Sequence, residues 1–216
     1  MLIRKLIILV SIFALLSGCQ SAYYSAMEKA GFHKRDILVD RVEDAKETQE
    51  ETKEQFKSAL EKFKSVKQFD GGNLERIYND LNAEFEESQA LAASIRDRIE
   101  SIEDVSEALF EEWETELEQY TSASLRSKNA ATLRQTKTEY NKLIRAMKKA
   151  ESRIQPVLNI FRDQVLNLKH NLNARAIQSL EGELGEIETN VNRLISEMNR
   201  SIDEANRFIS SMSTTS

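Results

Sequence analysis

The chain has 216 residues, of which 31% are charged and 40% hydrophobic, and its formal net charge is −6. It contains six glycines and one proline. No stretch after residue 19 alternates apolar and polar residues between turn signals, so we exclude a β-rich fold and expect long helices. Removing Arg4 and Lys5 with the N-terminal segment takes the charge from −6 to −8, which argues against nucleic acid as a partner.

An N-terminal export signal is predicted for residues 1–18. Two basic residues precede the apolar run 6–16, and Ser17 and Gly18 follow it. The run is far shorter than the roughly 20 residues needed to span a bilayer. Residues 16–19 read Leu-Ser-Gly-Cys and resemble the lipobox of bacterial lipoproteins. This resemblance implies cleavage between Gly18 and Cys19.

Cys19 is the only cysteine, so it cannot form an internal disulfide, and a free thiol would be reactive outside the cytoplasm. The lipobox resemblance implies that its sulfur carries a diacylglyceryl group. Several acyl chains, palmitate among them, would hold the protein stably in a membrane. Gln20 stands where an Asp commonly retains Gram-negative lipoproteins in the inner membrane. We therefore expect a lipid anchor in the outer membrane, a tether over residues 19–35, and a domain facing the periplasm.

Four helical segments are predicted within residues 36–216. The first has an apolar seam with steps of four and three, typical of a coiled coil, and polar layers at Gln49 and Thr52. It ends at "QFDGGN" (68–73), and the second follows over residues 74–120. "TSAS" (121–124) precedes the third segment, and the fourth runs through residues 177–212. The fold class is all-α, an elongated antiparallel coiled coil or up-down four-helix bundle.

The boundary between the third and fourth segments has an alternative. Asn171 and Asn173 can cap a new helix, but neither glycine nor proline forces a break there. With a turn, all four segments have about 40 to 50 residues and pack side by side. Without it, the fold has three helices, of which the C-terminal one is very long, about 90 residues. We favour the turn. Pro156 is expected to kink or break the third segment locally.

Charge predicts which helices pair. Residues 74–120 contain fifteen acids and three bases, net −12, whereas residues 122–170 contain three acids and eleven bases, net +8. Folded back through "TSAS", the acidic segment would lie antiparallel to the basic one. Exposed ion pairs contribute only about 0 to 1 kcal/mol each. We therefore expect the charge pattern to determine how the two helices are aligned more than how stable the bundle is.

Three strings resemble a known family. They are "CQSAYYSAMEKAGFHKRDILVDRVEDAKE" (19–47), "QFKSALEKFKSV" (55–66) and "FRDQVLNLKHNLNARAIQSLEGEL" (161–184). They are similar to uncharacterised proteobacterial proteins catalogued as domain-of-unknown-function family 2959, over essentially the whole mature chain. The resemblance implies an envelope lipoprotein with coiled coils and brings no catalytic or binding residues.

The residues themselves predict no enzyme, cofactor or metal site. The only thiol is the lipidation site, and no Gly-x-Ser-x-Gly elbow, phosphate loop or His-Glu-x-x-His pair occurs in the sequence. In an up-down bundle, His33 and His170 would lie at opposite ends, too far apart to share an ion. We therefore expect a protein without catalytic residues.

Two features are candidate partner contacts. Gly182 and Gly185 lie inside the fourth helix, off its apolar seam, and would permit another backbone to approach closely. The other is "LKHNLNARA" (168–176), at the end farthest from the lipid, where we expect contact with an envelope protein or the cell wall through Lys169, His170, Asn171, Asn173 and Arg175. The expected function is a scaffold or interaction module presented as a helical rod. The alternative is a peripheral module that senses or shapes a lipid surface, and homo-oligomers remain open.

Overall fold

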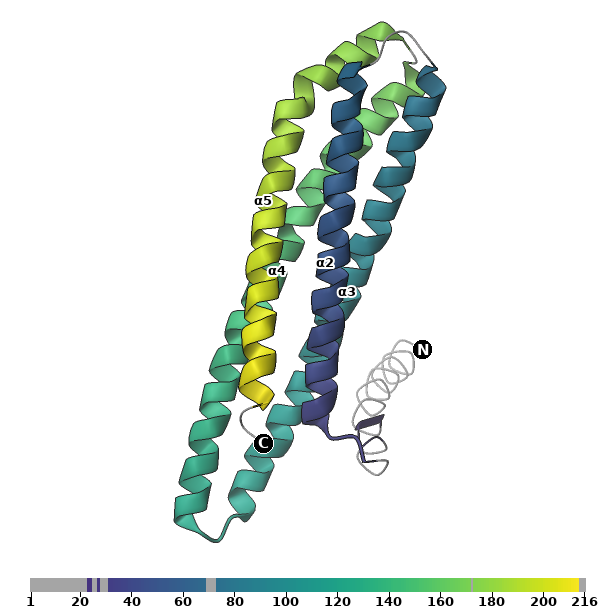
Figure 1. The fold of residues 1–216 in the computed structure, drawn as a ribbon. Helices are drawn as coiled ribbons and strands as arrows, with labels where there is room; N and C mark the ends of the chain where they lie inside the picture. The colour runs from purple at the N-terminus through teal and green to yellow at the C-terminus, as the bar shows by residue number, and fades with distance from the viewer. Residues whose placement is uncertain (1–22, 25–26, 28–30, 69–72, 172, 214–216) are drawn as a thin grey trace, which may run out of the picture.

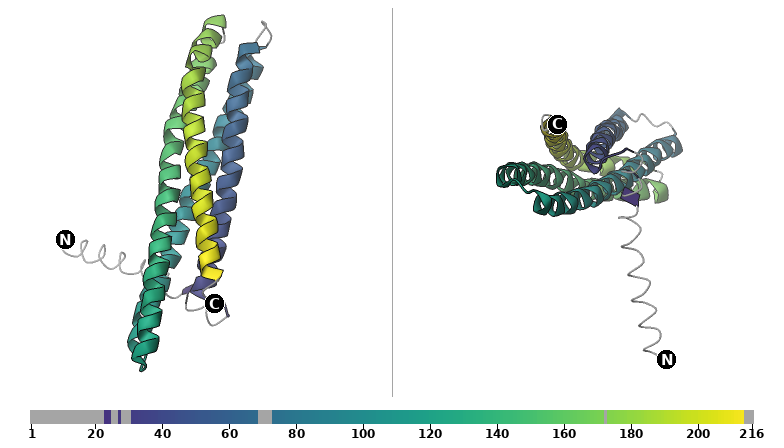
Figure 2. Two further views of the ribbon diagram at one scale, coloured as in Figure 1. Left: turned by 60° about the vertical axis from the view of Figure 1, so that its left-hand side comes forward. Right: turned by 90° about the horizontal axis from the view of Figure 1, so that it is seen from below.

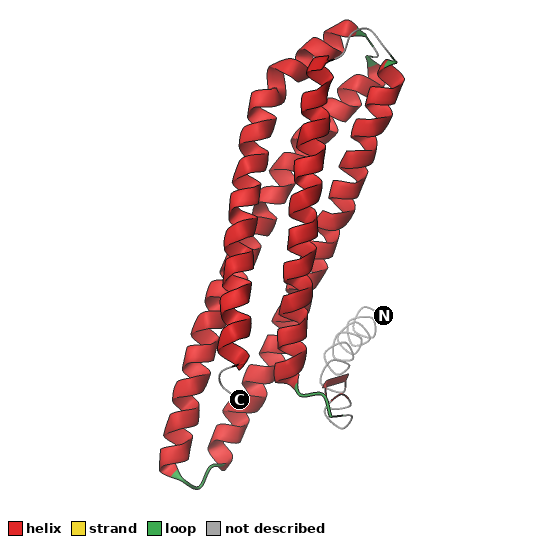
Figure 3. Ribbon diagram, viewed as in Figure 1, coloured by secondary structure: helices red, strands yellow, loops and turns green. Residues whose placement is uncertain are grey.

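Four long helices run side by side in a computed structural model that describes residues 23–24, 27, 31–68, 73–171 and 173–213 (Figure 1). They are α2 (Lys34–Ser65), α3 (Leu74–Gln119), α4 (Ala123–His170) and α5 (Ala174–Ser213), and the 3-10 helix η1 (Val66–Gln68) follows α2. Helix α2 packs against α3 and α5, and α4 also packs against α3 and α5. The described residues contain no strand (Figure 3), so the predicted up-down four-helix bundle is confirmed.

Each long helix after α2 begins at a polar cap that the sequence supplies. Asn73 Oδ1 accepts hydrogen bonds from the backbone amides of Glu75 and Arg76, and Ser122 Oγ accepts one from Leu125. Asn173 Oδ1 does the same for α5, whose chain direction reverses that of α4. The alternative of one C-terminal helix of about 90 residues is therefore wrong, because capping side chains satisfy the amides that a broken helix exposes.

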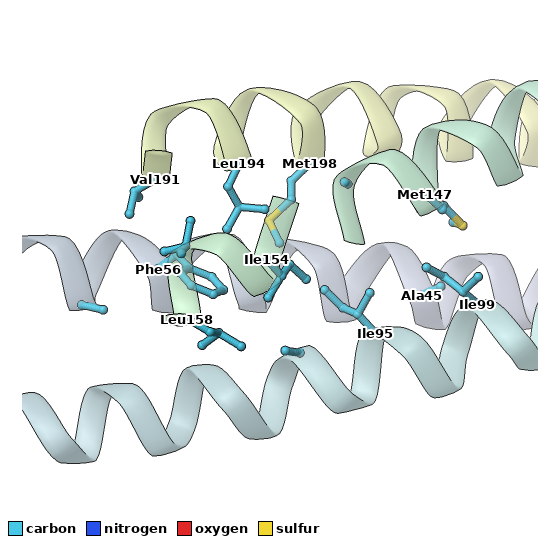
Figure 4. Close-up of a cluster of buried hydrophobic side chains, with 14 of the residues drawn as sticks. Ala45, Phe56, Ile95, Ile99, Met147, Ile154, Leu158, Val191, Leu194 and Met198 are labelled. Carbon is cyan, nitrogen blue, oxygen red and sulfur yellow. The ribbon is translucent and has the colours of Figure 1, made fainter. Parts of the chain in front are cut away.

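The predicted seam of the first helix is confirmed. All nine of its members are buried: Leu38, Val42, Ala45, Gln49, Thr52, Phe56, Ala59, Phe63 and Val66. Figure 4 shows side chains from all four helices meeting in the interior, among them Phe56, Ile95, Ile154 and Leu194. The rings of Phe56 and Phe63 lie 5.9 and 4.6 Å from that of Phe161. Burial of such apolar stripes is the main stabilising contribution in a bundle.

The buried stripes of α3 and α5 do not keep a strict heptad spacing. Ala92 is buried and Leu91 half-buried, and Phe208 is buried and Ile209 half-buried, as the core-facing position drifts around these helices. Of the two effects expected of Pro156, the break does not occur, because α4 continues from Ala123 to His170. Its side chain is exposed, so the ring lies on the solvent side of the helix.

The start of α2 corrects the predicted tether. Helix α2 begins at Lys34, so the last two residues assigned to the tether are helical. Gly31 has φ 91°, a conformation that favours glycine, and this turn sets the direction in which the chain enters the helix at His33. The remaining part of the tether, residues 19–22, 25–26 and 28–30, lies outside the described residues.

The predicted pairing of the acidic and basic helices is confirmed by contacts. Lys137 Nζ of α4 lies 2.6 Å from Glu114 Oε1 of α3. A second ion pair has its base on α3 and its acid on α4, between Arg96 and Glu151. Between α2 and α3, Lys34 Nζ lies 3.2 Å from Glu112 Oε1. This last contact places the start of α2 level with residue 112.

The helices differ in length, and the difference leaves one hairpin uncovered. Helix α3 continues for seven residues past Glu112, about 10 Å. At the end of α5, the ring of Phe208 lies 6.5 Å from that of Tyr140, and α5 ends five residues later, level with about residue 135 of α4. Residues 113–132 therefore project as a two-helix hairpin beyond both α2 and α5 (Figures 1 and 2), and we call them the overhang.

Candidate interaction surfaces

The predicted attachment site lies outside the described residues. This applies to Gly18, Cys19 and the whole signal segment 1–18. The first described residues are Tyr23 and Tyr24, whose rings meet edge to face with centroids 5.2 Å apart. Tyr24 is buried in the bundle core and Tyr23 is 47% exposed. Packing against the bundle therefore accounts for Tyr24, whereas the exposed ring of Tyr23 is open to contact with a lipid headgroup layer.

The turn between α4 and α5 lies at the end of the bundle opposite the start of α2 (Figure 1). Its two asparagines have local roles. Asn171 Nδ2 donates to the carbonyl of Asn167 at 3.2 Å, and Asn173 caps α5. Both side chains are exposed and their hydrogen bonds stay within the turn. We call the described residues of this turn, 171 and 173, the platform; their hydrogen bonds hold the end of α4 and the start of α5.

Two cationic side chains and one histidine flank that platform. Lys169, His170 and Arg175 are all exposed, and none of them makes a side-chain hydrogen bond or ion pair with another described residue. The structure thus brings together all five residues predicted as a partner contact. A cluster of unpaired donors at the end of a rod is suited to carboxylate or phosphate groups on another molecule.

Gly182 and Gly185 lie on the exposed face of α5, in the third and fourth turns after that platform. A Cβ atom built at either position would have no neighbour within 4 Å. No described helix approaches them, so packing inside the bundle does not explain them. The prediction that they admit a partner's backbone is not tested by this arrangement.

The two histidines lie at opposite ends of the bundle, His33 before α2 and His170 at the end of α4. Among the described residues, no group of three or more His, Cys, Asp and Glu side chains is placed to hold a metal ion. None of the described helices is both long and apolar enough to cross a membrane.

The sequence analysis did not predict a groove, lined mostly by basic side chains, that lies between α4 and α5. The groove has a volume of about 300 Å³ and is lined by Lys142, Arg145 and Lys149 of α4 and by Arg200 and Arg207 of α5. Acidic side chains moderate its charge. Glu197 accepts from Lys149, which lowers the pKa of that carboxyl, and Glu204 pairs with Arg207. The available signal was the seven-residue spacing of Arg193, Arg200 and Arg207, which puts them on one face of a helix.

A second groove, on the overhang, was not predicted. It has a volume of about 460 Å³ and lies between the α3 and α4 parts of the hairpin, beside the start of α2. The signal was present in the apolar stripe, which continues through Trp113, Leu117 and Tyr120 past the point where α2 begins. Periodicity alone does not say whether another helix covers such a stripe.

A family model described as a protein of unknown function, DUF2959, matches residues 23–212 of the chain. The match spans all four helices of the bundle. No curated protein and no solved structure matches the chain.

Proposed function

Because the chain belongs to the DUF2959 family, whose description assigns no activity, we propose its function from its own residues. It is a non-enzymatic lipoprotein, anchored at Cys19 in the outer membrane, that holds a helical rod in the periplasm. The rod acts as a scaffold or interaction module for envelope components. This proposal assigns no catalytic residue and no cofactor.

One observation carries the proposal. The chain that leads from Cys19 enters the bundle at the start of α2, whereas the exposed cations of the α4–α5 turn lie at the opposite end. Helix α2 has 32 residues, so this end is displaced by about 48 Å along the axis. A rigid spacer between a lipid attachment and a cluster of free donors supports a role in reaching a partner away from the membrane.

The chemistry of the turn supports an anionic partner. Lysine offers a compact charge and arginine a planar fork of donors, and both recognise carboxylate or phosphate groups. An acidic surface of an envelope protein fits this description, and so does a cell-wall polymer that carries carboxylates. Gly182 and Gly185 would add a smooth helix face next to the turn for such a partner.

Crosslinking in intact cells tests the partner. A photoreactive amino acid at position 170 or 175 should capture an envelope component, and Lys169→Gln combined with Arg175→Gln should reduce the yield severalfold. The matched control is position 152, where Ser152 is exposed in the middle of α4. Equal capture from positions 152 and 170, or no capture from either 170 or 175, would contradict the proposal.

A separate experiment tests the anchor. The wild-type chain should incorporate labelled palmitate and fractionate with the outer membrane, whereas Cys19→Ala should lose the label and remain uncleaved. Gln20→Asp should move the lipidated protein toward the inner membrane. A wild-type chain that carries no lipid, or that sediments with the inner membrane, would contradict this part of the proposal.

The basic groove favours one second candidate, a module that lies on an anionic lipid surface. Five cationic side chains of α4 and α5 line this groove together with three acidic ones, Glu197, Asp203 and Glu204, which leaves an excess of positive charge although the chain as a whole is acidic. Protein that starts after Cys19 should then sediment with vesicles containing anionic lipid. Arg200→Glu with Arg207→Glu should abolish sedimentation, whereas Arg162→Glu, an exposed site on α4 outside the groove, should not. Absence of sedimentation would exclude this candidate.

A further inference from the structure

The overhang ends in a tip that carries no charge. Residues 119–125, which read Gln-Tyr-Thr-Ser-Ala-Ser-Leu, contain no acidic or basic side chain, and we call them the tip. All of them are exposed except Tyr120, which is half-buried. Arg126 follows the tip and donates a hydrogen bond from Nη2 to the carbonyl of Tyr120 at 2.7 Å, and Ser122 caps α4. The tip is therefore a closed, uncharged turn, unlike the cationic turn at the opposite end of the bundle.

Exposed apolar side chains gather at this end of the molecule. Among the described residues, four large apolar side chains are exposed: Tyr23, Phe32, Leu125 and Leu166. Leu125 belongs to the tip. Tyr23 and Phe32 belong to the segment that leads into α2, whose described part lies beside the start of that helix (Figures 1 and 2). Leu166 alone lies near the other end, four residues before α4 ends. Tyrosine suits a membrane interface, because its ring has an apolar body and a polar tip.

The anchor proposed at Cys19 lies close to the same end. Tyr24 is buried in the core of the bundle, and Cys19 precedes it by five residues. Five residues of fully extended chain span about 18 Å at most. The overhang extends about 10 Å beyond the start of α2, because α3 continues for seven residues past Glu112. The tip of an upright rod therefore comes within about 8 Å of the lipid surface even with a fully extended tether, and a tether spanning about 10 Å brings it to that surface.

The charges beside the tip indicate the kind of lipid it can contact. Residues 113–132 contain three acids on the α3 side and two bases on the α4 side, net −1: Glu114, Glu116, Glu118, Arg126 and Lys128. This balance gives no attraction to an anionic surface. A zwitterionic headgroup layer has no net charge and presents both signs, so it accommodates both sides of the hairpin. Because the apolar area of the tip is small, the contact needs the anchor to hold the protein on the membrane.

We propose that the tip of the overhang is a second membrane contact, in which Leu125 and Tyr120 rest in the zwitterionic headgroup layer of the leaflet that carries the lipidated Cys19. This contact depends on the anchor proposed above and adds the orientation of the rod. The anchor beside the start of α2 and the tip of the hairpin are two attachments at one end, and together they hold the bundle upright. The cationic turn between α4 and α5 is then kept away from the same membrane, as its proposed partner contact requires.

Fluorescence quenching by a labelled lipid tests the contact. Lipidated full-length protein is purified from membranes and reconstituted in phosphatidylcholine vesicles that carry a nitroxide on the headgroup. Because Cys19 is acylated, the cysteine of Leu125→Cys is the only thiol that reacts with a fluorophore. We expect quenching at least threefold stronger from position 125 than from Leu166→Cys. Leu166 is the matched control, because it is also an exposed leucine of α4, at 44% against 51% for Leu125.

The outcomes separate the tip contact from the anchor. Flotation of the vesicles and the mass of the protein report the anchor independently of quenching. Acylated protein that floats with the vesicles, but is quenched no more at position 125 than at 166, would overturn the tip contact and leave the anchor standing. Strong quenching at both positions would mean that the rod lies flat, and quenching that needs added phosphatidylglycerol would mean attraction by charge; each would overturn the proposal. Protein that has no acyl group and does not float would overturn the anchor and the tip contact together.

A second variant separates binding of the tip from mere proximity to lipid. With the fluorophore at Ser124→Cys, Leu125→Gln should lower the quenching at least twofold, because the apolar side chain is then missing from the headgroup layer. Leu166→Gln should leave it unchanged. Leu125 is exposed, so helical content and melting temperature should stay the same. Equal quenching with and without Leu125→Gln would show that the tip lies near lipid without binding it, and would contradict the proposal.

Discussion

Gln49 and Thr52 are the two polar residues in the seam of α2, and they differ in whether the buried side chain is hydrogen-bonded. Both are at most 1% exposed. The hydroxyl of Thr52 donates to the carbonyl of Thr48 at 2.7 Å, whereas neither the oxygen nor the nitrogen of the Gln49 amide has a hydrogen-bond partner among the described residues. An unsatisfied buried amide is costly, because it loses its bonds to water and gains none. Gln49 is therefore a destabilising position in this core.

Replacing Gln49 should stabilise the bundle. Gln49→Leu keeps a similar volume and removes the unsatisfied amide, so we expect the free energy of unfolding to rise by about 1 to 3 kcal/mol. Urea denaturation followed by circular dichroism measures this change. Thr52→Val is the control and should have a smaller effect, since that hydroxyl is already bonded. A destabilised Gln49→Leu variant would mean that the amide is satisfied in solution.

Glu197 should make the stability of the bundle depend on pH. Lys149 of α4 donates a hydrogen bond to this α5 carboxylate, and that contact lowers its pKa in the folded protein. The associated stability is present above the unfolded pKa of about 4.3 and is lost as the pH falls through the lower folded value. We expect no more than about 1 kcal/mol, since Lys149 is exposed to solvent.

The measurement is the free energy of unfolding between pH 6 and pH 3. Glu197→Gln should flatten this profile, and Lys149→Gln should flatten it by a similar amount. The double variant should match the single ones, because both substitutions remove the same interaction. Parallel profiles for the wild type and Glu197→Gln would show that other carboxylates account for the dependence.

Among the elements, the α4–α5 turn was predictable because its determinants are local. Asn171 and Asn173 are two positions apart in the sequence, and the cap at Asn173 needs only the amides of the next few residues. The groove between α4 and α5 was only half predictable, because it depends on how two helices are rotated against each other. The lysines of α4 were visible as a run, but their position beside Arg200 and Arg207 is set by tertiary packing.

The cap of α5 gives a prediction at this scale. Asn173→Ala removes the oxygen that accepts from the amides of Arg175 and Ala176, and should lower the free energy of unfolding by about 1 kcal/mol. Asn171→Ala is a close control, because that side chain bonds back to Asn167 and caps no helix start. Urea denaturation of the two variants compares them, and equal losses would contradict the assignment of Asn173 as the cap.

At the scale of the whole molecule, the sequence predicted the number, order and pairing of the helices but not their ends. Four segments of similar length were expected, whereas α2 has 32 residues and α4 has 48. An apolar stripe records which face of a helix is buried, and it looks the same whether the cover comes from the same chain or from another. The stripe through Trp113 and Tyr120 therefore could not reveal the overhang until the start of α2 was placed beside Glu112.

The overhang should be dispensable for folding. Its apolar members Trp113, Leu117 and Tyr120 are only half-buried, and Trp113 and Leu117 pack at the edge of the core shared by the four helices. Replacing residues 115–130 by a four-residue linker should leave one cooperative unfolding transition with a melting temperature within a few degrees of the wild type. The urea m-value should fall slightly, in proportion to the apolar surface removed.

Urea denaturation followed by circular dichroism makes this measurement on the wild type and the shortened chain. The bundle should stay intact because α2 and α5, which cover α3 and α4 along the rest of their length, do not reach the deleted residues. A shortened chain that loses its cooperative transition would instead make the hairpin part of the folding core.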